Sequence, residues 1–155
     1  MSEYFGSNVR SDDYMLLVGR IAMFVLFIPS GMRKLLEFNA FLASLAARTL
    51  PFGMHFPFPE AWAALAVAAE VGGTILLLLG CKARWTAIVM AVFVVIATLT
   101  SHRYWELEGA IRQAQSSSFY KNIAIFGGLL FLYVSGPGAL SVDALLRWKR
   151  GARPR

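Results

Sequence analysis

The chain has 155 residues, of which 57% are hydrophobic and only 15% are charged. Soluble domains of this length usually carry about a quarter charged residues, so the composition excludes an ordinary soluble domain and favours a polytopic membrane protein. The net charge is +6, and five of the fifteen basic residues lie in the tail 147–155. A basic cluster after a last span is typical of a cytoplasmic segment near anionic lipid, and we do not expect nucleic acid as a partner.

Four apolar stretches predict transmembrane helices, because a helix needs about 20 apolar residues to cross a bilayer. They cover residues 14–32, 61–80, 85–101 and 122–140. Continuous apolar runs do not show the alternation of barrel strands, and only helices and closed barrels satisfy every backbone group in lipid. The sequence therefore predicts an all-α, integral membrane four-helix bundle over residues 14–143. A polar segment, 1–13, precedes it, and a basic tail, 144–155, follows.

The connections between the spans differ in length. Residues 81–84 form a tight turn, so the second and third spans should be antiparallel neighbours. In the first long connection, four apolar residues recur at helical spacing and predict a short interfacial helix: Phe38, Phe41, Leu42 and Leu45. In the second, Glu108 and Arg112 have the i,i+4 spacing that supports a helical turn.

Four spans place both ends of the bundle on one side of the membrane, and the basic tail favours the cytoplasm for that side. The lone Cys81 excludes an intrachain disulfide, so helix packing must hold the fold together. His55 and His102 are far apart and have no cysteine pair nearby, so we expect no metal site.

Glu70 lies near the middle of the otherwise uncharged run 61–80. A carboxyl group at this depth costs several kcal/mol unless it is paired, protonated or hydrated. We therefore expect it to face the bundle interior, where Gly73 and Thr74 on the same face leave space beside it. Two interpretations are open: Glu70 exchanges protons at a functional site, or it forms a structural ion pair or interhelical hydrogen bond.

Polar residues gather where three spans meet the outer surface. Ser30 and Lys34 end the first span, Thr98 and His102 end the third, and Lys121 and Asn122 begin the fourth. Helix geometry places these ends together, so the pattern predicts a funnel with cations at its mouth and Glu70 on its floor. The alternative is that the lysines snorkel at helix ends and His102 belongs to an interfacial aromatic belt.

A second polar pair is expected at the inner surface. Arg20 lies inside the first span, and Asp143 follows Ser141, which is a suitable helix N-cap. We expect Arg20 and Asp143 to form a structural ion pair. The alternative partners for Arg20 are Asp12 and Asp13.

Several short motifs recur in a fixed order along the chain: SGMRKL at 30–35, EVGG at 70–73, AT at 97–98 with His102 and Trp105, FYKN at 119–122, GGLL at 127–130 and GPG at 136–138. Their order and spacing resemble the DoxX family of small four-helix membrane proteins over residues 14–143. Arg20 and Asp143 also stand where the family has such residues.

The resemblance implies a bacterial or archaeal cytoplasmic membrane and a quinone-linked redox role, with one branch similar to a subunit of thiosulfate:quinone oxidoreductase. A short chain with one cysteine would need a partner subunit for such electron transfer. On this hypothesis, Glu70 and His102 are catalytic groups that exchange protons, and a quinone or small polar-headed ligand binds Ser30, Lys34, Thr98, Lys121 and Asn122. The alternative is a non-catalytic scaffold or accessory subunit of a larger membrane complex.

Overall fold

The computed structural model describes residues 9–48 and 53–151. Most of the predicted polar segment 1–13 and the last residues of the basic tail therefore lie outside the described residues. The elements, in chain order, are α2 (Ser11–Leu36), α3 (Phe38–Ala46), α4 (Pro59–Val67), η2 (Ala68–Gly73), α5 (Thr74–Leu79), α6 (Ala83–Ser101), η3 (Tyr104–Glu106), α7 (Gly109–Ser135) and α8 (Val142–Lys149).

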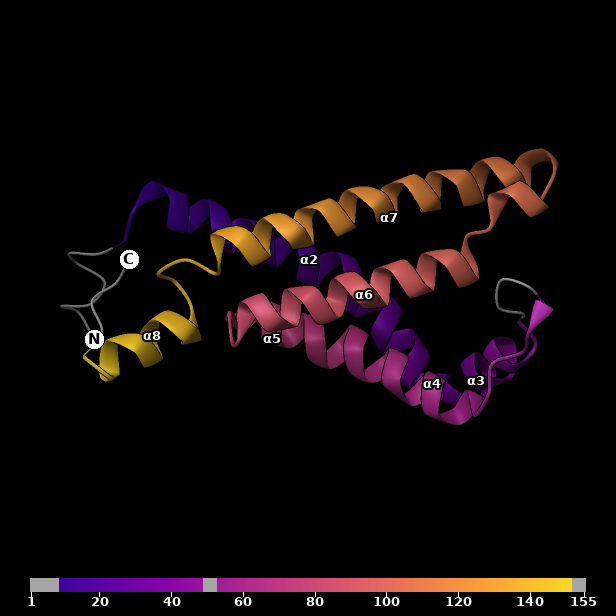
Figure 1. The fold of residues 1–155 in the computed structure, drawn as a ribbon, viewed down its shortest axis with the longest axis horizontal. Coiled ribbons are helices and arrows are strands. Elements are labelled where there is room, and N and C mark those ends of the chain that lie inside the picture. Colours follow the sequence, from indigo (N-terminus) through magenta and orange to yellow (C-terminus); the bar gives the residue numbers. More distant parts are fainter. Residues whose placement is uncertain (1–8, 49–52, 152–155) are drawn as a thin grey trace.

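Four helical stretches are long and apolar enough to cross a membrane, as the sequence predicts. They are Ser11–Leu36, Pro59–Leu79, Ala83–Glu106 and Gly109–Ser135, with mean hydropathies of 1.9, 1.9, 1.9 and 1.2. They lie lengthwise along the molecule, with α8 and the start of α2 at one end and α3 at the other (Figure 1). We call these the α8 end and the α3 end. The predicted all-α four-helix bundle is confirmed.

The bundle core contains side chains from all four stretches. Phe27 of α2 and Leu77 of α5 meet Met90 of α6 and Leu129 of α7, and the last three of these are fully buried. Glycines allow the helices to approach closely. A Cβ atom on Gly128 would lie 2.8 Å from the terminal methyl of Met23, so the missing side chain on α7 leaves room for this flexible side chain of α2.

The helix bounds differ from prediction at the fourth span. We expected this span to begin at residue 122, but α7 already begins at Gly109. The polar stretch before residue 122 is thus helical, and within it the hydroxyls of Ser116 and Ser118 donate to the carbonyls of Gln113 and Ala114, 2.9 and 3.2 Å away. The helix ends at Gly136, whose φ of 77° favours glycine.

The predicted short helix in the first long connection is confirmed as α3. Its apolar face packs on α4: Leu45, Phe56 and Ala63 form a small buried cluster against which Phe38, Phe41 and Leu42 pack. The tight turn between the second and third spans is also present, because α5 ends at Leu79 and α6 begins at Ala83. Gly80 makes this turn with a φ of 64°.

Candidate ligand-binding cavity

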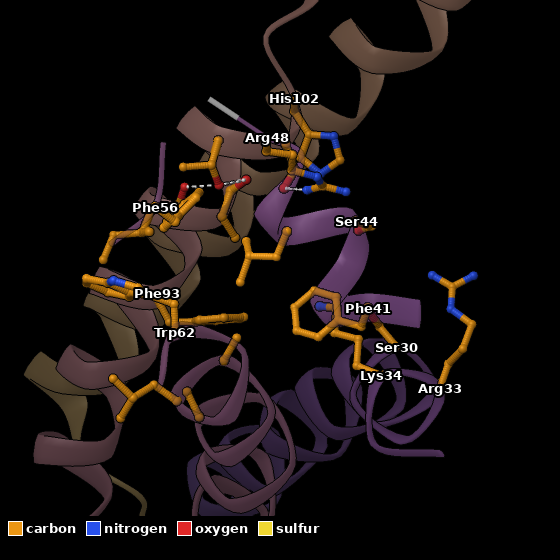
Figure 2. Close-up of a pocket in the computed structure, with 18 of the residues that line it drawn as sticks. Ser30, Arg33, Lys34, Phe41, Ser44, Arg48, Phe56, Trp62, Phe93 and His102 are labelled. Atoms are coloured by element: carbon orange, nitrogen blue, oxygen red, sulfur yellow. Dashed lines mark hydrogen bonds between the residues drawn. The ribbon is translucent and has the colours of Figure 1, made fainter. Parts of the chain in front are cut away.

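A cavity of about 610 Å³ lies between α2, α3, α4 and α6 at the α3 end. Its volume is in the range of sites that bind small organic molecules. Four aromatic residues line it: Phe41, Phe56, Trp62 and Phe93. Polar and charged groups interrupt this apolar lining (Figure 2): Ser30, Arg33, Lys34, Glu37, Ser44, Arg48, Thr100, Ser101 and His102.

The ammonium group of Lys34 donates to the Oε2 atom of Glu70 and forms an ion pair with it. Glu70 is only 3% exposed, so it faces the bundle interior as expected. The Lys34 side chain is 23% exposed and lines the cavity. Its Nζ atom also lies 5.5 and 5.8 Å from the ring centroids of Phe41 and Phe93. A cation over aromatic faces is stabilised by the ring quadrupoles. The Lys34 ammonium group is therefore positioned both by Glu70 and by the rings of Phe41 and Phe93.

Glu70 belongs to η2, a π-helical segment that interrupts the α-helical geometry of the second span. Such segments are rare and occur frequently at functional sites. Two glycines allow neighbouring helices to approach this wider turn. A Cβ atom on Gly31 would lie 2.9 Å from Cγ2 of Val71, and one on Gly73 would lie 2.6 Å from the sulfur of Met90. The pairing of Glu70 with Lys34 therefore depends on small residues around it.

Thr98 and Asn122 form a link between α6 and α7. The Nδ2 atom of Asn122 donates to Oγ1 of Thr98 at 2.9 Å, and that hydroxyl donates to the carbonyl of Val94 at 2.6 Å. Neither residue lines the cavity. The contact pairs polar groups of two neighbouring spans. Thr98 and Asn122 therefore lie away from the cavity, although the sequence analysis expected them at the ligand site.

His102 lines the cavity at its α3 end. Its Nδ1 atom lies 2.7 Å from Oε1 of Gln115; because an amide oxygen only accepts, Nδ1 carries the hydrogen in this arrangement. Lys121, by contrast, is exposed on α7 and does not line the cavity. Within residues 9–48 and 53–151, no group of three or more His, Cys, Asp or Glu side chains is placed to hold a metal ion.

Arg48 is a lining residue that the sequence analysis did not identify. It follows the end of α3, is half-buried, and donates through its Nη1 atom to the hydroxyl of Ser101 at the end of α6. The aromatic residues Trp62 and Phe93 were also missed. Their only sequence signal was aromatic character inside a span, which does not distinguish a cavity wall from a surface that faces lipid.

The α8 end contains the second predicted pair. Arg20 is 1% exposed and donates to the carbonyl of Leu78 at 2.8 Å and to that of Leu140. Asp143 accepts from the backbone N–H groups of Lys82 and Ala83 at 2.7 and 2.9 Å. The ion pairs within the described residues do not include Arg20 with Asp143. Each of the two charged groups instead binds backbone groups at helix ends.

Asp13, considered as an alternative partner of Arg20, also binds backbone. Its Oδ1 atom accepts from the N–H of Ala139 at 2.6 Å, and its Oδ2 atom accepts from that of Arg10 at 2.8 Å. The N-cap expected at Ser141 is present, since its hydroxyl accepts from the N–H of Ala144 at 3.2 Å. Together these contacts form a polar clamp that joins the start of α2, the 80–83 turn and the start of α8.

The four long apolar helices, the buried ion pair and the cavity define a multi-pass integral membrane protein. The DoxX family model matches residues 15–103. The chain therefore belongs to the DoxX family. The SURF4 family model matches residues 60–148, and no solved structure matches the chain.

Three curated proteins are similar over most of this chain. Inner membrane protein YphA of Escherichia coli K12 is 33% identical over 83% of this chain and 88% of its own length. Inner membrane protein YqjF of the same organism is 34% identical over 90% of this chain and 98% of its own length. ER-derived vesicles protein ERV29 of Saccharomyces cerevisiae is 26% identical over 92% of this chain and 37% of its own length. Similarity to YphA and YqjF assigns this chain to the inner membrane.

Proposed function

We propose that this chain is an integral membrane subunit associated with quinone-linked redox chemistry, and that its cavity binds a quinone or another small polar-headed ligand. One observation carries the proposal: Lys34, whose side chain is partly exposed, lines a cavity walled by Phe41 and Phe93, and its ammonium group is paired with the buried Glu70. The cavity thus combines a hydrogen-bond donor with flat apolar surfaces, which suits a ring that carries oxygen atoms.

Lys34 is the group that would contact such a ring. An ammonium group has three donors, and one of them is directed to Glu70. The other two are available to a carbonyl or hydroxyl oxygen in the cavity. Glu70 neutralises the lysine, so a neutral ligand does not leave an isolated charge in the membrane. In this role Glu70 acts through Lys34, and proton exchange at Glu70 or His102 stays a prediction.

The orientation belongs to the same proposal. The basic tail favours the cytoplasm for the α8 end, which would direct the α3 end and the cavity outward. A ligand could then enter from the outer leaflet or from the compartment outside it. A protein partner would supply the electron-transfer groups of a complete oxidoreductase.

Trp62 provides a direct test, because its side chain lines the cavity. A variant with Trp62 as the single tryptophan (Trp85→Phe, Trp105→Phe and Trp148→Phe) is titrated with decylubiquinone in lipid nanodiscs. We expect saturable quenching that weakens at least tenfold in Lys34→Met. Lys121→Met is the matched control, since Lys121 is exposed and outside the cavity, and it should bind as the parent does. Quenching without saturation, or equal in both variants, would contradict quinone binding at Lys34.

The scaffold alternative also has an observation in its favour. Lys34 and Glu70 satisfy each other, so the pair is stable without any ligand. If the pair only fixes the helices, Lys34→Met lowers stability and leaves no binding to lose. Mass spectrometry after purification in mild detergent would then find protein subunits with the chain and no quinone.

A further inference from the structure

The charge balance of the cavity changes along its length, from Lys34, which we call its floor, to Arg48 at its α3 end. On the floor, Lys34 is neutralised by Glu70. Toward the surface, Arg33 and Glu37 are both exposed lining residues, one helical turn apart, so their opposite charges offset each other. Arg48 remains as the cation whose charge has no acidic counterpart in the lining.

The surroundings of Arg48 are polar but neutral. Its described side-chain partner is the Ser101 hydroxyl, and neighbouring His102 is bonded to the neutral amide of Gln115. The ion pairs within the described part of the chain do not include Arg48. A half-buried charge beside apolar walls is costly unless an opposite charge approaches it. The described part of the protein therefore provides no acidic partner for Arg48, and a bound anion could supply one.

From this we infer that the end of the cavity at Arg48 and Ser101 binds the carboxylate of a long-chain amphiphile, with the acyl tail against the aromatic walls. The inference rests on the proposal that the cavity is a ligand site, and it names the charge of the head group. A single uncompensated guanidinium matches a monoanion, and its planar fork of N–H donors matches a carboxylate. The Ser101 hydroxyl can donate a further hydrogen bond.

The competing role for Arg48 is structural. Ser101 is the last residue of α6, and a cation near a helix C-terminus is stabilised by the helix dipole. A structural role predicts lower stability on mutation and no preference between charged and neutral amphiphiles. The two roles therefore differ in whether the unmutated site prefers a charged amphiphile to a neutral one.

The test compares 9,10-dibromostearate with its methyl ester in nanodiscs that contain the single-tryptophan protein. Bromine quenches tryptophan at short range, so Trp62 reports occupation of the cavity. We expect the acid to quench saturably and at least tenfold more tightly than the ester. Arg48→Gln should remove this preference, Arg48→Lys should reduce it, and Arg112→Gln, which changes an exposed cation outside the lining, should retain it.

The outcomes separate the inference from the proposed function. Equal affinity for acid and ester, or an unchanged preference in Arg48→Gln, overturns the carboxylate site and leaves the cavity as a ligand site. Saturable binding of neither amphiphile overturns the carboxylate site as well, and failure of decylubiquinone in the same protein would overturn the proposed function. If Arg48→Gln does not fold, the ratio of the affinities for acid and ester in the unmutated protein still decides whether the site prefers a carboxylate. A tightly retained phospholipid that the acid cannot displace also overturns the inference.

Discussion

The carboxylate of Glu70 and the ammonium of Lys34 are bonded across two helices, 36 positions apart in the sequence. Glu70 is buried while the Lys34 side chain is partly exposed to the cavity. The pair thus connects the protein interior with the cavity. Removal of one member leaves the other charge without its partner in a region of low dielectric constant, so the two residues should respond to mutation as a unit.

The first prediction concerns this pair. Glu70→Gln retains the size of the side chain and leaves the Lys34 charge uncompensated, so it should lower the free energy of unfolding by about 2–4 kcal/mol. Adding Lys34→Met should recover part of the loss, because no buried charge then remains unpaired. Thermal unfolding in mild detergent measures both effects. Additive losses would show that the two residues act independently.

The second prediction concerns Gly31, which allows α2 to approach the π-helical turn. In Gly31→Ala the new methyl group would lie 2.9 Å from Cγ2 of Val71 and 3.2 Å from Cγ of Glu70. It should therefore destabilise the protein by about 1–3 kcal/mol and weaken the Lys34–Glu70 pair.

Gly72→Ala is the matched control for Gly31→Ala. Gly72 lies in the same π-helical turn as Glu70, but a Cβ atom there would have no heavy atom within 4 Å. This variant should be neutral or slightly more stable. Equal losses in the two variants would mean that the turn, and not the close approach of α2, limits stability.

The fold could be predicted from sequence because bilayer thickness and hydropathy determine it almost directly. The buried position of Glu70 followed from the same energetic argument. The π-helical turn around Glu70 could not be predicted, because it depends on how Gly31 and Gly73 meet neighbouring helices. Such contacts involve residues distant in sequence.

The candidate site was predicted only in part, because sequence position along a span gives depth more reliably than direction. The sequence analysis expected Lys34 at the mouth of the funnel and Glu70 on its floor, whereas Lys34 is the lining residue and Glu70, its ion-pair partner, is buried outside the lining. Lys121 has a similar depth, yet it projects outward from α7. Arg48 was missed because its contact with Ser101 joins the connection after α3 to the end of α6, and the sequence shows no periodic signal for such a contact.

The third prediction tests orientation with the single native cysteine. Cys81 lies in the turn at the α8 end and is partly exposed. If this end is cytoplasmic, an impermeant maleimide added to intact cells should leave Cys81 unlabelled and should label it after lysis. In a Cys81→Ser background, Glu108→Cys near the α3 end should show labelling from outside. The reverse pattern would invert the topology and would place the cavity on the cytoplasmic side.

The last prediction concerns the polar clamp at the α8 end. Arg20→Ala would leave the carbonyls of Leu78 and Leu140 without their buried donor, and should lower the free energy of unfolding by about 2–4 kcal/mol. Asp143→Ala removes the acceptor for two N–H groups at the start of α6 and should lower it by about 1–2 kcal/mol.

Arg20 binds the last turn of α5 and the segment before α8, and Asp143 binds the start of α6 from α8. Both residues thus attach the α8 segment to the same helix–turn–helix region, so the double variant should lose less than the sum of the single losses. Asp12→Ala is the control, since the ion pair of Asp12 with Arg10 is highly exposed and should contribute little. Melting temperatures in one detergent compare the four variants with the unmutated protein. Strict additivity of Arg20→Ala and Asp143→Ala would show that α2 and α8 are anchored to the turn independently, and a loss in Asp12→Ala as large as in Arg20→Ala would indicate a general charge effect instead of the clamp.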